Sequence, residues 1–198
     1  MAAGSGERFG KAKQYELLGD RRVMDWSLGV ARKVSDSVVL VVPAAHAADH
    51  EPLADVVVAG GDTRSASVRA GLSVVAHDTT HVLVHDAARP VPLVDVWRKV
   101  IDALRHGATA VVPVVSVTDT LRERDGSTID RSRLVAVQTP QGFDVDVLRA
   151  AHAGGDDATD DATLAEAIGA RVVLVEGDIR NIKITDAPHL VMAEFLIR

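Results

Sequence analysis

Short apolar runs recur along the chain and indicate a regular alternation of strands and helices. Five β-branched runs are continuous rather than alternating, and they occupy residues 37–43, 55–61, 81–88, 109–115 and 171–177. Continuous apolar runs of this length are typical of strands that are buried on both faces of a parallel sheet. The five runs therefore predict five central strands.

Helical spacing fills the intervals between these runs. Residues 64–76 carry Val68, Leu72 and Val75 at the spacing i, i+4, i+7, and residues 93–107 also present one apolar face. This period predicts amphipathic helices. Strands that alternate with helices predict an α/β class, with a mostly parallel sheet covered by helices on both faces. We expect the whole chain to form one domain.

One segment interrupts the alternation. Residues 119–140 are polar, and Asp125-Gly126 at their centre is a strong hairpin turn signal. A charged hairpin cannot bury itself against its own α/β domain. We therefore expect a protruding β-hairpin arm at about residues 118–138, which either packs on a partner subunit or stays solvated.

Composition narrows the classes of function. The chain has 198 residues, 47% of them apolar, a formal net charge of −6, 3% aromatic residues and no cysteine. The negative charge and scarce aromatics argue against a nucleic-acid partner. The absence of cysteine excludes disulfides and thiolate metal sites. No apolar run approaches the ~18 residues that span a bilayer, so we expect a cytoplasmic protein without a membrane partner.

The opening segment, MAAGSGERFG, is the first candidate site. Its glycines are spaced G-x-G-x-x-x-G from Gly4 onward, which is neither the dinucleotide fingerprint nor the P-loop. Closely spaced glycines let backbone N–H groups approach an anion, although a plain tight turn explains them equally well. Three cations next to the glycines favour a triphosphate over a turn: Arg8, Lys11 and Lys13.

A second glycine pair follows the second predicted strand. Gly60-Gly61 leads into a helix that begins near Thr63. A strand–Gly–Gly–helix junction is an anion or base site at the carboxyl edge of an open α/β sheet. The alternative is that Asp62 and Thr63 only cap the helix. Both interpretations stay open on these residues.

A third candidate is HDAARP, where Asp86 ends a predicted strand and Arg89 follows three residues later. A strand-end aspartate can bind Mg²⁺ that bridges phosphates, and a guanidinium can bind an oxyanion. The alternative is a local ion pair between Asp86 and Arg89. We interpret the neighbouring His85 as structural.

Weaker signals lie toward the end of the chain. Thr139 precedes Pro140 and is expected to be extended, with a hydroxyl available to a substrate. Lys183 lies between two isoleucines, so it is either a phosphate partner or a solvated edge-strand lysine. Asp160 and Asp161 precede an apolar period, and we interpret them as a helix cap and a first-turn acid rather than a metal site.

Taken together, AAGSGERFG, KQY, GGDTRSASVRAGL, HDAARP, TPQGF and NIKIT make the chain resemble the 2-C-methyl-D-erythritol 4-phosphate cytidylyltransferases. The resemblance covers nearly the whole chain. It implies a Rossmann-like nucleotidyltransferase domain, a homodimer built through the arm, Mg²⁺ as cofactor, and transfer of a cytidylyl group from CTP to a polyol phosphate with release of pyrophosphate.

The resemblance also implies a role for each matching residue. The residues that would stabilise charge during catalysis are Arg8, Lys13, Arg131 and Lys183. Those that would bind CTP are Ala2, Ala3, Gly4, Gly6, Gly61, Asp62 and Ser67. Those that would bind the polyol phosphate are Asp86, Arg89, Thr120 and Thr139, with Asp86 also holding Mg²⁺. Thr120 and Arg131, on the arm, would complete the pocket of the partner subunit.

The chain departs from the family at two points. Ala12 stands where the family usually has proline, and no hydrophobic strand precedes the first glycine segment, so we expect the natural chain to start upstream of Met1. Several alternatives stay open. They are a ribitol 5-phosphate cytidylyltransferase, a guanylyl- or uridylyltransferase, a non-catalytic nucleotide-binding module, and a fragment of a longer fusion enzyme.

Overall fold

The central sheet has the strand order β11–β6–β10–β5, with β9 beside β6. In this computed structural model, which describes residues 1–4, 6, 9–10 and 12–198, its strands are β5 (His81–Val84), β6 (Ala110–Ser116), β9 (Val135–Val137), β10 (Gln141–Asp144) and β11 (Val172–Glu176). β11 pairs parallel with β6. β10 is antiparallel to both β5 and β6. Strands β5, β6 and β11 therefore run in one direction, as the apolar runs predict.

A second parallel pair extends this architecture on the other side of the N-terminus. It consists of β3 (Val39–Val42) and β4 (Val56–Ala59). The Ala2 amide donates to the Val41 carbonyl at 2.7 Å, and the Met1 carbonyl accepts from the Ala87 amide at 2.9 Å. The first residues of the chain thus lie between β3 and the end of β5, and they connect the two groups of strands.

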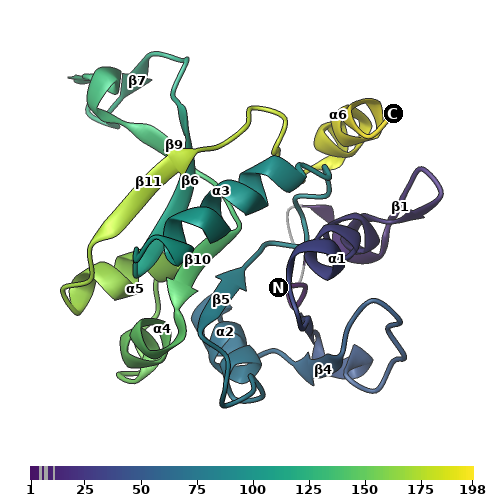
Figure 1. The fold of residues 1–198 in the computed structure, drawn as a ribbon. Helices are drawn as coiled ribbons and strands as arrows, with labels where there is room; N and C mark the ends of the chain where they lie inside the picture. Colours follow the sequence, from purple (N-terminus) through teal and green to yellow (C-terminus); the bar gives the residue numbers. More distant parts are fainter. Residues whose placement is uncertain (5, 7–8, 11) are drawn as a thin grey trace.

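Helices cover both faces of the central sheet (Figure 1). Helix α3 (Val94–Arg105) covers one face, and α4 (Val145–His152) and α5 (Asp161–Ala167) cover the other. The remaining helices are α1 (Val23–Val34), α2 (Arg64–Leu72) and α6 (Ala187–Leu196). Strand β6 shows the division, because its successive side chains point to opposite faces. Val111 packs with Val100 and Leu104 of α3, whereas Ala110 and Val112 belong to the cluster that α4 and α5 cover.

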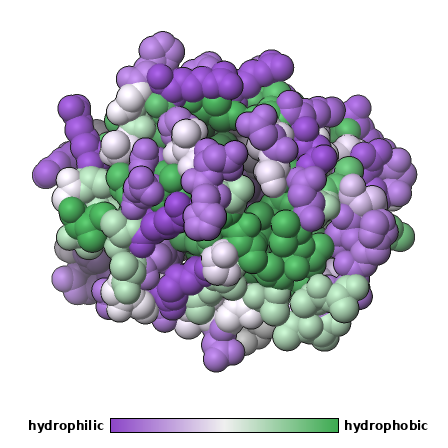
Figure 2. All heavy atoms as spheres, turned by 60° about the horizontal axis from the view of Figure 1, so that its bottom comes forward, coloured by the Kyte–Doolittle hydropathy of each residue, from purple (hydrophilic) through white to green (hydrophobic). Residues whose placement is uncertain are grey.

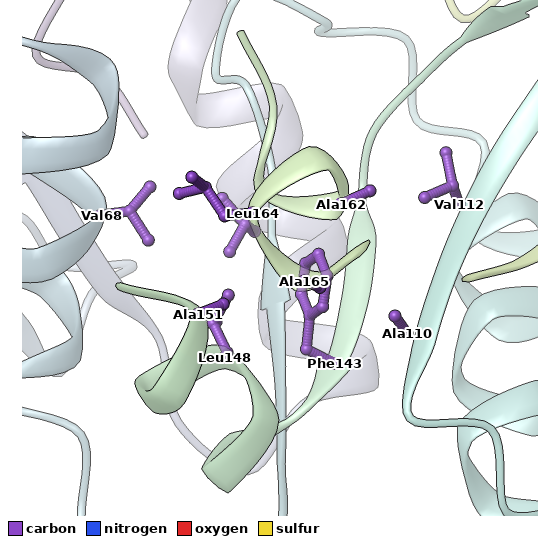
Figure 3. Close-up of a cluster of buried hydrophobic side chains, with 10 residues drawn as sticks. Val68, Ala110, Val112, Phe143, Leu148, Ala151, Ala162, Leu164 and Ala165 are labelled. Atoms are coloured by element: carbon purple, nitrogen blue, oxygen red, sulfur yellow. The ribbon is translucent and has the colours of Figure 1, made fainter. Parts of the chain in front are cut away.

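The larger core cluster lies beneath α4 and α5. The ring of Phe143 on β10 extends toward Ala165 of α5, with Leu148 of α4 nearby (Figure 3). Phe143 and Leu148 have no exposed surface. Burial of such a side chain contributes about 1.5–3 kcal/mol relative to exposure. The cluster therefore fixes the sheet and the two helices as one unit.

The polar segment forms a protruding arm, as expected. Strands β7 (Leu121–Arg122) and β8 (Thr128–Ile129) form a hairpin, in which Gly126 takes a positive φ of 94°. After the 3₁₀ turn η4 (Arg131–Arg133), strand β9 returns antiparallel to β6. The arm extends away from the helices (Figure 1). Its apolar residues Val135 and Val137 remain exposed.

Smaller elements complete the chain. They are the 3₁₀ turns η2 (Lys13–Tyr15) and η3 (Ala44–His46), and the hairpin of β1 (Leu17–Leu18) and β2 (Arg21–Arg22). On the face that Figure 2 shows, polar side chains are interrupted by apolar patches. Within the part of the chain that the structure describes, no helix has the length and apolar character needed to cross a bilayer.

The predicted elements are mostly confirmed, with one boundary to correct. All five apolar runs form strands, and the helix expected at 93–107 is α3. The helix expected over 64–76 ends at Leu72, so Val75 lies outside it. There the Val74 and Val75 amides donate to carbonyls three residues back. Such bonds tighten the last helical turn, and β-branched residues have low helix propensity.

Candidate active site

The two glycine segments meet in space. A Cβ added to Gly60 would lie 2.4 Å from the Ala3 Cβ and 2.7 Å from the Ser67 Oγ. A Cβ added to Gly61 would lie 2.6 Å from the Ala66 Cβ. Only glycine allows so close an approach between backbones. The segment after β4 therefore forms one surface with the first residues of the chain.

A buried glutamine amide holds the first glycine segment in place. The Gln14 Nε2 donates to the Ala2 carbonyl at 2.7 Å and to the Gly4 carbonyl at 3.2 Å. Gln14 itself is buried on η2, beside the half-buried Lys13. Lys13, a predicted cation of the site, is thus the immediate neighbour of the residue that holds the first glycine segment. Arg8 lies outside the described residues.

The second glycine segment is shaped by the start of α2. The Ser67 Oγ accepts from the Gly61 amide at 3.1 Å and donates to the Gly61 carbonyl at 3.2 Å. Thr63 is the helix cap, because its hydroxyl accepts from the Ala66 amide at 3.0 Å. Asp62 is exposed, and it is not the cap of α2. The geometry leaves the Asp62 side chain available at the surface and uses the Ser67 hydroxyl to shape the turn.

Asp86 follows β5 and contacts cations from two distant segments. Its Oδ2 lies 2.6 Å from the Lys183 Nζ, and its Oδ1 lies 3.8 Å from the Arg64 Nε. Burial alone would raise the pKa of Asp86, but the charges of Lys183 and Arg64 outweigh it and hold the pKa far below its usual range. The carboxylate is therefore ionised at neutral pH.

Thr139 supports the backbone at Asp86. Its Oγ1 accepts from the Asp86 amide at 3.1 Å and lies 3.1 Å from the His85 Nδ1. Thr139 is buried, and burial lowers the pKa of His85 to about 3. The expected substrate role of Thr139 stays a prediction. The described contacts already use its hydroxyl to orient the strand end.

Arg89 does not form the local ion pair that the sequence leaves open. Its guanidinium donates to the Asn181 carbonyl at 2.6 Å and to the Val137 carbonyl at 3.4 Å. The Asn181 side chain in turn donates to the Thr139 carbonyl at 2.9 Å. The hydrogen bonds of Arg89 and Asn181 thus connect the segment that carries Lys183 to the end of the arm.

Lys183 lies in irregular backbone rather than on a strand. The expected alternation nevertheless holds. Ile184 is fully buried in the cluster of Leu18 and Ala193, while Lys183 points to Asp86. The isoleucines on either side of Lys183 therefore set the direction of its side chain, as the sequence suggests.

Thr120 and Arg131 are not brought to this cluster within the chain. Both are exposed on the arm, where an Arg131 guanidinium N–H donates to the Thr118 carbonyl. The arm extends away from the N-terminal segment (Figure 1). Their predicted roles depend on a second subunit and stay predictions.

Sequence reasoning missed two residues that shape the site. Arg64 follows directly after Thr63 and faces both Asp86 and the buried Asp161. Its place at the start of a helix gives no hint of a partner about a hundred residues away. Gln14 stands within the recognisable KQY motif, but nothing in that motif shows that its amide binds the glycine segment.

The described residues do not form a metal site of their own. They contain no cluster of three or more His, Asp or Glu side chains that could hold a metal ion. Asp86 supplies one carboxylate, and Lys183 already contacts it. Mg²⁺ commonly binds through one or two carboxylates together with substrate phosphates. A magnesium ion would fit here only as part of a metal–phosphate complex.

The comparisons with known proteins agree with this geometry. The profile described as "IspD: 2-C-methyl-D-erythritol 4-phosphate cytidylyltransferase" matches residues 1–198. A Rhodococcus jostii protein named 2-C-methyl-D-erythritol 4-phosphate cytidylyltransferase is 42% identical over 209 residues, which cover 99% of this chain and 92% of that protein.

A longer relative and a solved structure extend the comparison. The "Bifunctional enzyme IspD/IspF" of Agrobacterium fabrum is 38% identical over 98% of this chain, which spans 54% of its length. The crystal structure of the Thermus thermophilus 2-C-methyl-D-erythritol 4-phosphate cytidylyltransferase superposes with a TM-score of 0.83 and 37% identity, covering 93% of each chain. The chain belongs to the 2-C-methyl-D-erythritol 4-phosphate cytidylyltransferase family.

Proposed function

We propose that this chain transfers the cytidylyl group of CTP to 2-C-methyl-D-erythritol 4-phosphate, giving 4-diphosphocytidyl-2-C-methyl-D-erythritol and pyrophosphate. One observation carries the proposal: the two glycine segments adjoin each other, and the first is bonded to both neighbours of Asp86. The Met1 amine donates to the His85 carbonyl at 2.7 Å, and the Met1 carbonyl accepts from the Ala87 amide. Backbone donors, a carboxylate and Lys183 thus share one edge of the sheet.

The chemistry requires charge stabilisation rather than a nucleophilic side chain. An oxygen of the substrate phosphate forms a bond to the α-phosphorus of CTP, while the bond from that phosphorus to the pyrophosphate oxygen breaks. Two polyanions meet in this step, so catalysis depends on positioning and on cations. In the proposal, Arg8, Lys13 and Lys183 supply that positive charge.

The glycine segments bind the nucleotide in this proposal. Backbone groups of Ala2, Ala3, Gly4 and Gly6 would face the triphosphate, and Gly61 with Asp62 would face the cytosine and ribose. The Gln14 amide and the Ser67 hydroxyl hold these segments in shape before the nucleotide arrives. Such preorganisation lowers the entropy cost of binding.

Magnesium enters the proposal together with the nucleotide. Asp86 is the carboxylate that adjoins the first glycine segment, and phosphate oxygens would supply the remaining ligands. When bound, the ion would neutralise triphosphate charge. The protein groups would orient the phosphates and keep the Lys183 ammonium within reach of them.

We also propose that two copies of the chain assemble through their arms. The supporting observation is the exposed apolar surface of Leu134, Val135 and Val137, at the end of the arm where β9 pairs with β6. Exposed apolar residues on a projecting element mark an interaction surface. The partner would then bring Thr120 and Arg131 to the polyol phosphate.

Mixing two inactive variants tests this shared pocket. Arg131→Ala and Lys183→Ala homodimers should each be nearly inactive. Coexpressed or subunit-exchanged mixtures should regain about a quarter of wild-type activity, because half of the dimers are mixed and each mixed dimer has one intact pocket. Light scattering measures the assembly in parallel. No recovery in a verified mixed dimer would contradict a pocket shared between subunits.

Pyrophosphate release tests the activity itself. The purified chain is incubated with CTP, Mg²⁺ and 2-C-methyl-D-erythritol 4-phosphate, and ribitol 5-phosphate serves as the matched control acceptor. We expect turnover with the first acceptor and little with the second. Faster turnover with ribitol 5-phosphate, or none with either acceptor, would refute the proposal.

A further inference from the structure

A buried ionic network lies behind Asp86, and neither the glycine segments nor the phosphate chemistry accounts for it. Arg64 is at its centre. Its guanidinium lies 2.8 Å from the Asp161 Oδ2 through one terminal nitrogen, and 3.8 Å from the Asp86 Oδ1 through Nε. The Arg64 side chain is 23% exposed, compared with 41% for Lys183. Of the two cations at Asp86, Arg64 is therefore the more enclosed.

Asp161 is held firmly by its surroundings. It has no exposed surface, and its Oδ1 lies 3.0 Å from the His152 Nε2. Its own amide donates to the Gln141 Oε1 at 3.2 Å, while the Gln141 Nε2 donates to Asp160 at 2.9 Å. Gln141 is also fully buried. The first turn of α5 therefore presents the Asp161 carboxylate in a fixed direction.

The charge on Asp161 has no role as a helix cap. Asp160 is the cap, because its Oδ1 accepts from the Thr163 amide at 3.0 Å. Burial would raise the pKa of Asp161, but His152 and Arg64 outweigh it, so the carboxyl stays ionised. A buried ion pair is weak evidence for stability, since desolvation opposes the attraction. The charge is better explained by what it does to Arg64.

The two cations at Asp86 differ in what else holds them. Lys183 contacts Asp86 from within the irregular segment between β11 and α6, and its side chain is the more exposed. A lysine ammonium on a flexible stem can turn to an arriving phosphate. The Arg64 guanidinium instead forms a close ion pair with the fully buried Asp161 carboxylate, which opposes its movement toward a phosphate.

We propose that Asp161 is a positioning residue that fixes Arg64 beside Asp86, so that Asp86 keeps a cationic partner when Lys183 turns to the substrate phosphates. The inference rests on the proposed function for its kinetic consequence. It assigns no contact with substrate to either Arg64 or Asp161. Without Asp161, Arg64 loses its shortest ion pair, and Asp86 retains Lys183 as its main counter-ion.

Kinetics give the first test. Asp161→Asn keeps the shape of the side chain and removes its charge. It should lower kcat by about 10- to 100-fold, the range expected when a distant change misplaces a site group by about 1 Å. The double variant R64M/D161N should be no slower than R64M, because both act through one guanidinium. Asp161→Glu keeps the charge and should recover most of the loss.

Arg69→Met is the matched control. Arg69 also connects α2 to the same segment, since its guanidinium donates to the Asp156 carbonyl at 3.0 Å, but it does not contact Asp86. Its loss should leave kcat within about twofold of wild type. If R69M were as slow as D161N, or if R64M and D161N were additive, Asp161 would act only by docking α2, and the inference would fail.

Urea unfolding gives a second test that needs no turnover. The coupling between Arg64 and Asp86 is measured from R64M, D86N and the double variant, both with and without D161N. We expect measurable coupling that D161N abolishes. Coupling that survives D161N would overturn the inference. An inactive wild type that shows the coupling would instead refute the proposed function alone, so the two failures are distinguishable.

Discussion

Replacing Gly60 with alanine should displace the first glycine segment and slow the enzyme. The new Cβ would lie 2.4 Å from the Ala3 Cβ, whereas ordinary contacts begin at 3.4 Å. One segment must therefore move by about 1 Å. A misplacement of this size costs up to about 10²-fold in rate. Overpacking of this kind also costs about 1–3 kcal/mol of unfolding free energy.

Steady-state kinetics with CTP and urea unfolding measure the two effects of Gly60→Ala. Gly29→Ala is the matched control. Gly29 lies within α1, and a Cβ added there meets no atom within 4 Å. This control should keep wild-type kinetics and gain about 0.5–1 kcal/mol of stability, as expected for a helix interior. A folded G60A variant with wild-type kcat and KM would refute the contact between the glycine segments as a determinant of activity.

Two further predictions concern single side chains. Lys13→Ala and Lys183→Ala should each lower kcat by roughly 10²-fold or more, as the loss of one charge-stabilising donor does; near-normal turnover in both would remove them from the chemistry. Between about pH 3 and about pH 6.5, the unfolding free energy of the wild type should rise with pH. His85→Gln should make this rise less steep. Burial lowers the pKa of His85 to about 3. The unfolded chain therefore binds the additional proton in this window, and wild-type stability falls as the pH falls, by up to about 1.4 kcal/mol per pH unit. The unfolding free energies of wild type and H85Q are measured by urea titration at each pH. If both changed with pH at the same rate, this assignment would be contradicted.

The strands that carry the site could be predicted from the sequence because their signal is local. Each of the five apolar runs is continuous, and a run of this kind has few alternatives to a strand within the sheet. The turn residues Asp125-Gly126 likewise predict the hairpin. β10 was missed, because Gln141–Asp144 has four residues and begins with a buried glutamine.

The partners of individual side chains could not be predicted, because they come from distant segments. HDAARP leaves open an ion pair between Asp86 and Arg89 as the alternative to a binding site. In the fold, Asp86 instead pairs with Lys183 and Arg64, and Arg89 donates hydrogen bonds to backbone carbonyls. Thr139 illustrates the same limit. A substrate role is predicted for its hydroxyl, and the spacing gives no sign that the same hydroxyl also accepts from the Asp86 amide. Spacing identifies candidates, and the choice among their partners is made by tertiary packing.

A crystal structure of the protein with bound CTP tests the central claim most directly. We predict that the triphosphate lies against Ala3 and Gly4 and that the base lies beside Gly61. We also predict that the Lys183 Nζ has moved from Asp86 to a phosphate oxygen. A nucleotide bound elsewhere, or a Lys183 that remains on Asp86 and makes no phosphate contact, would contradict the account.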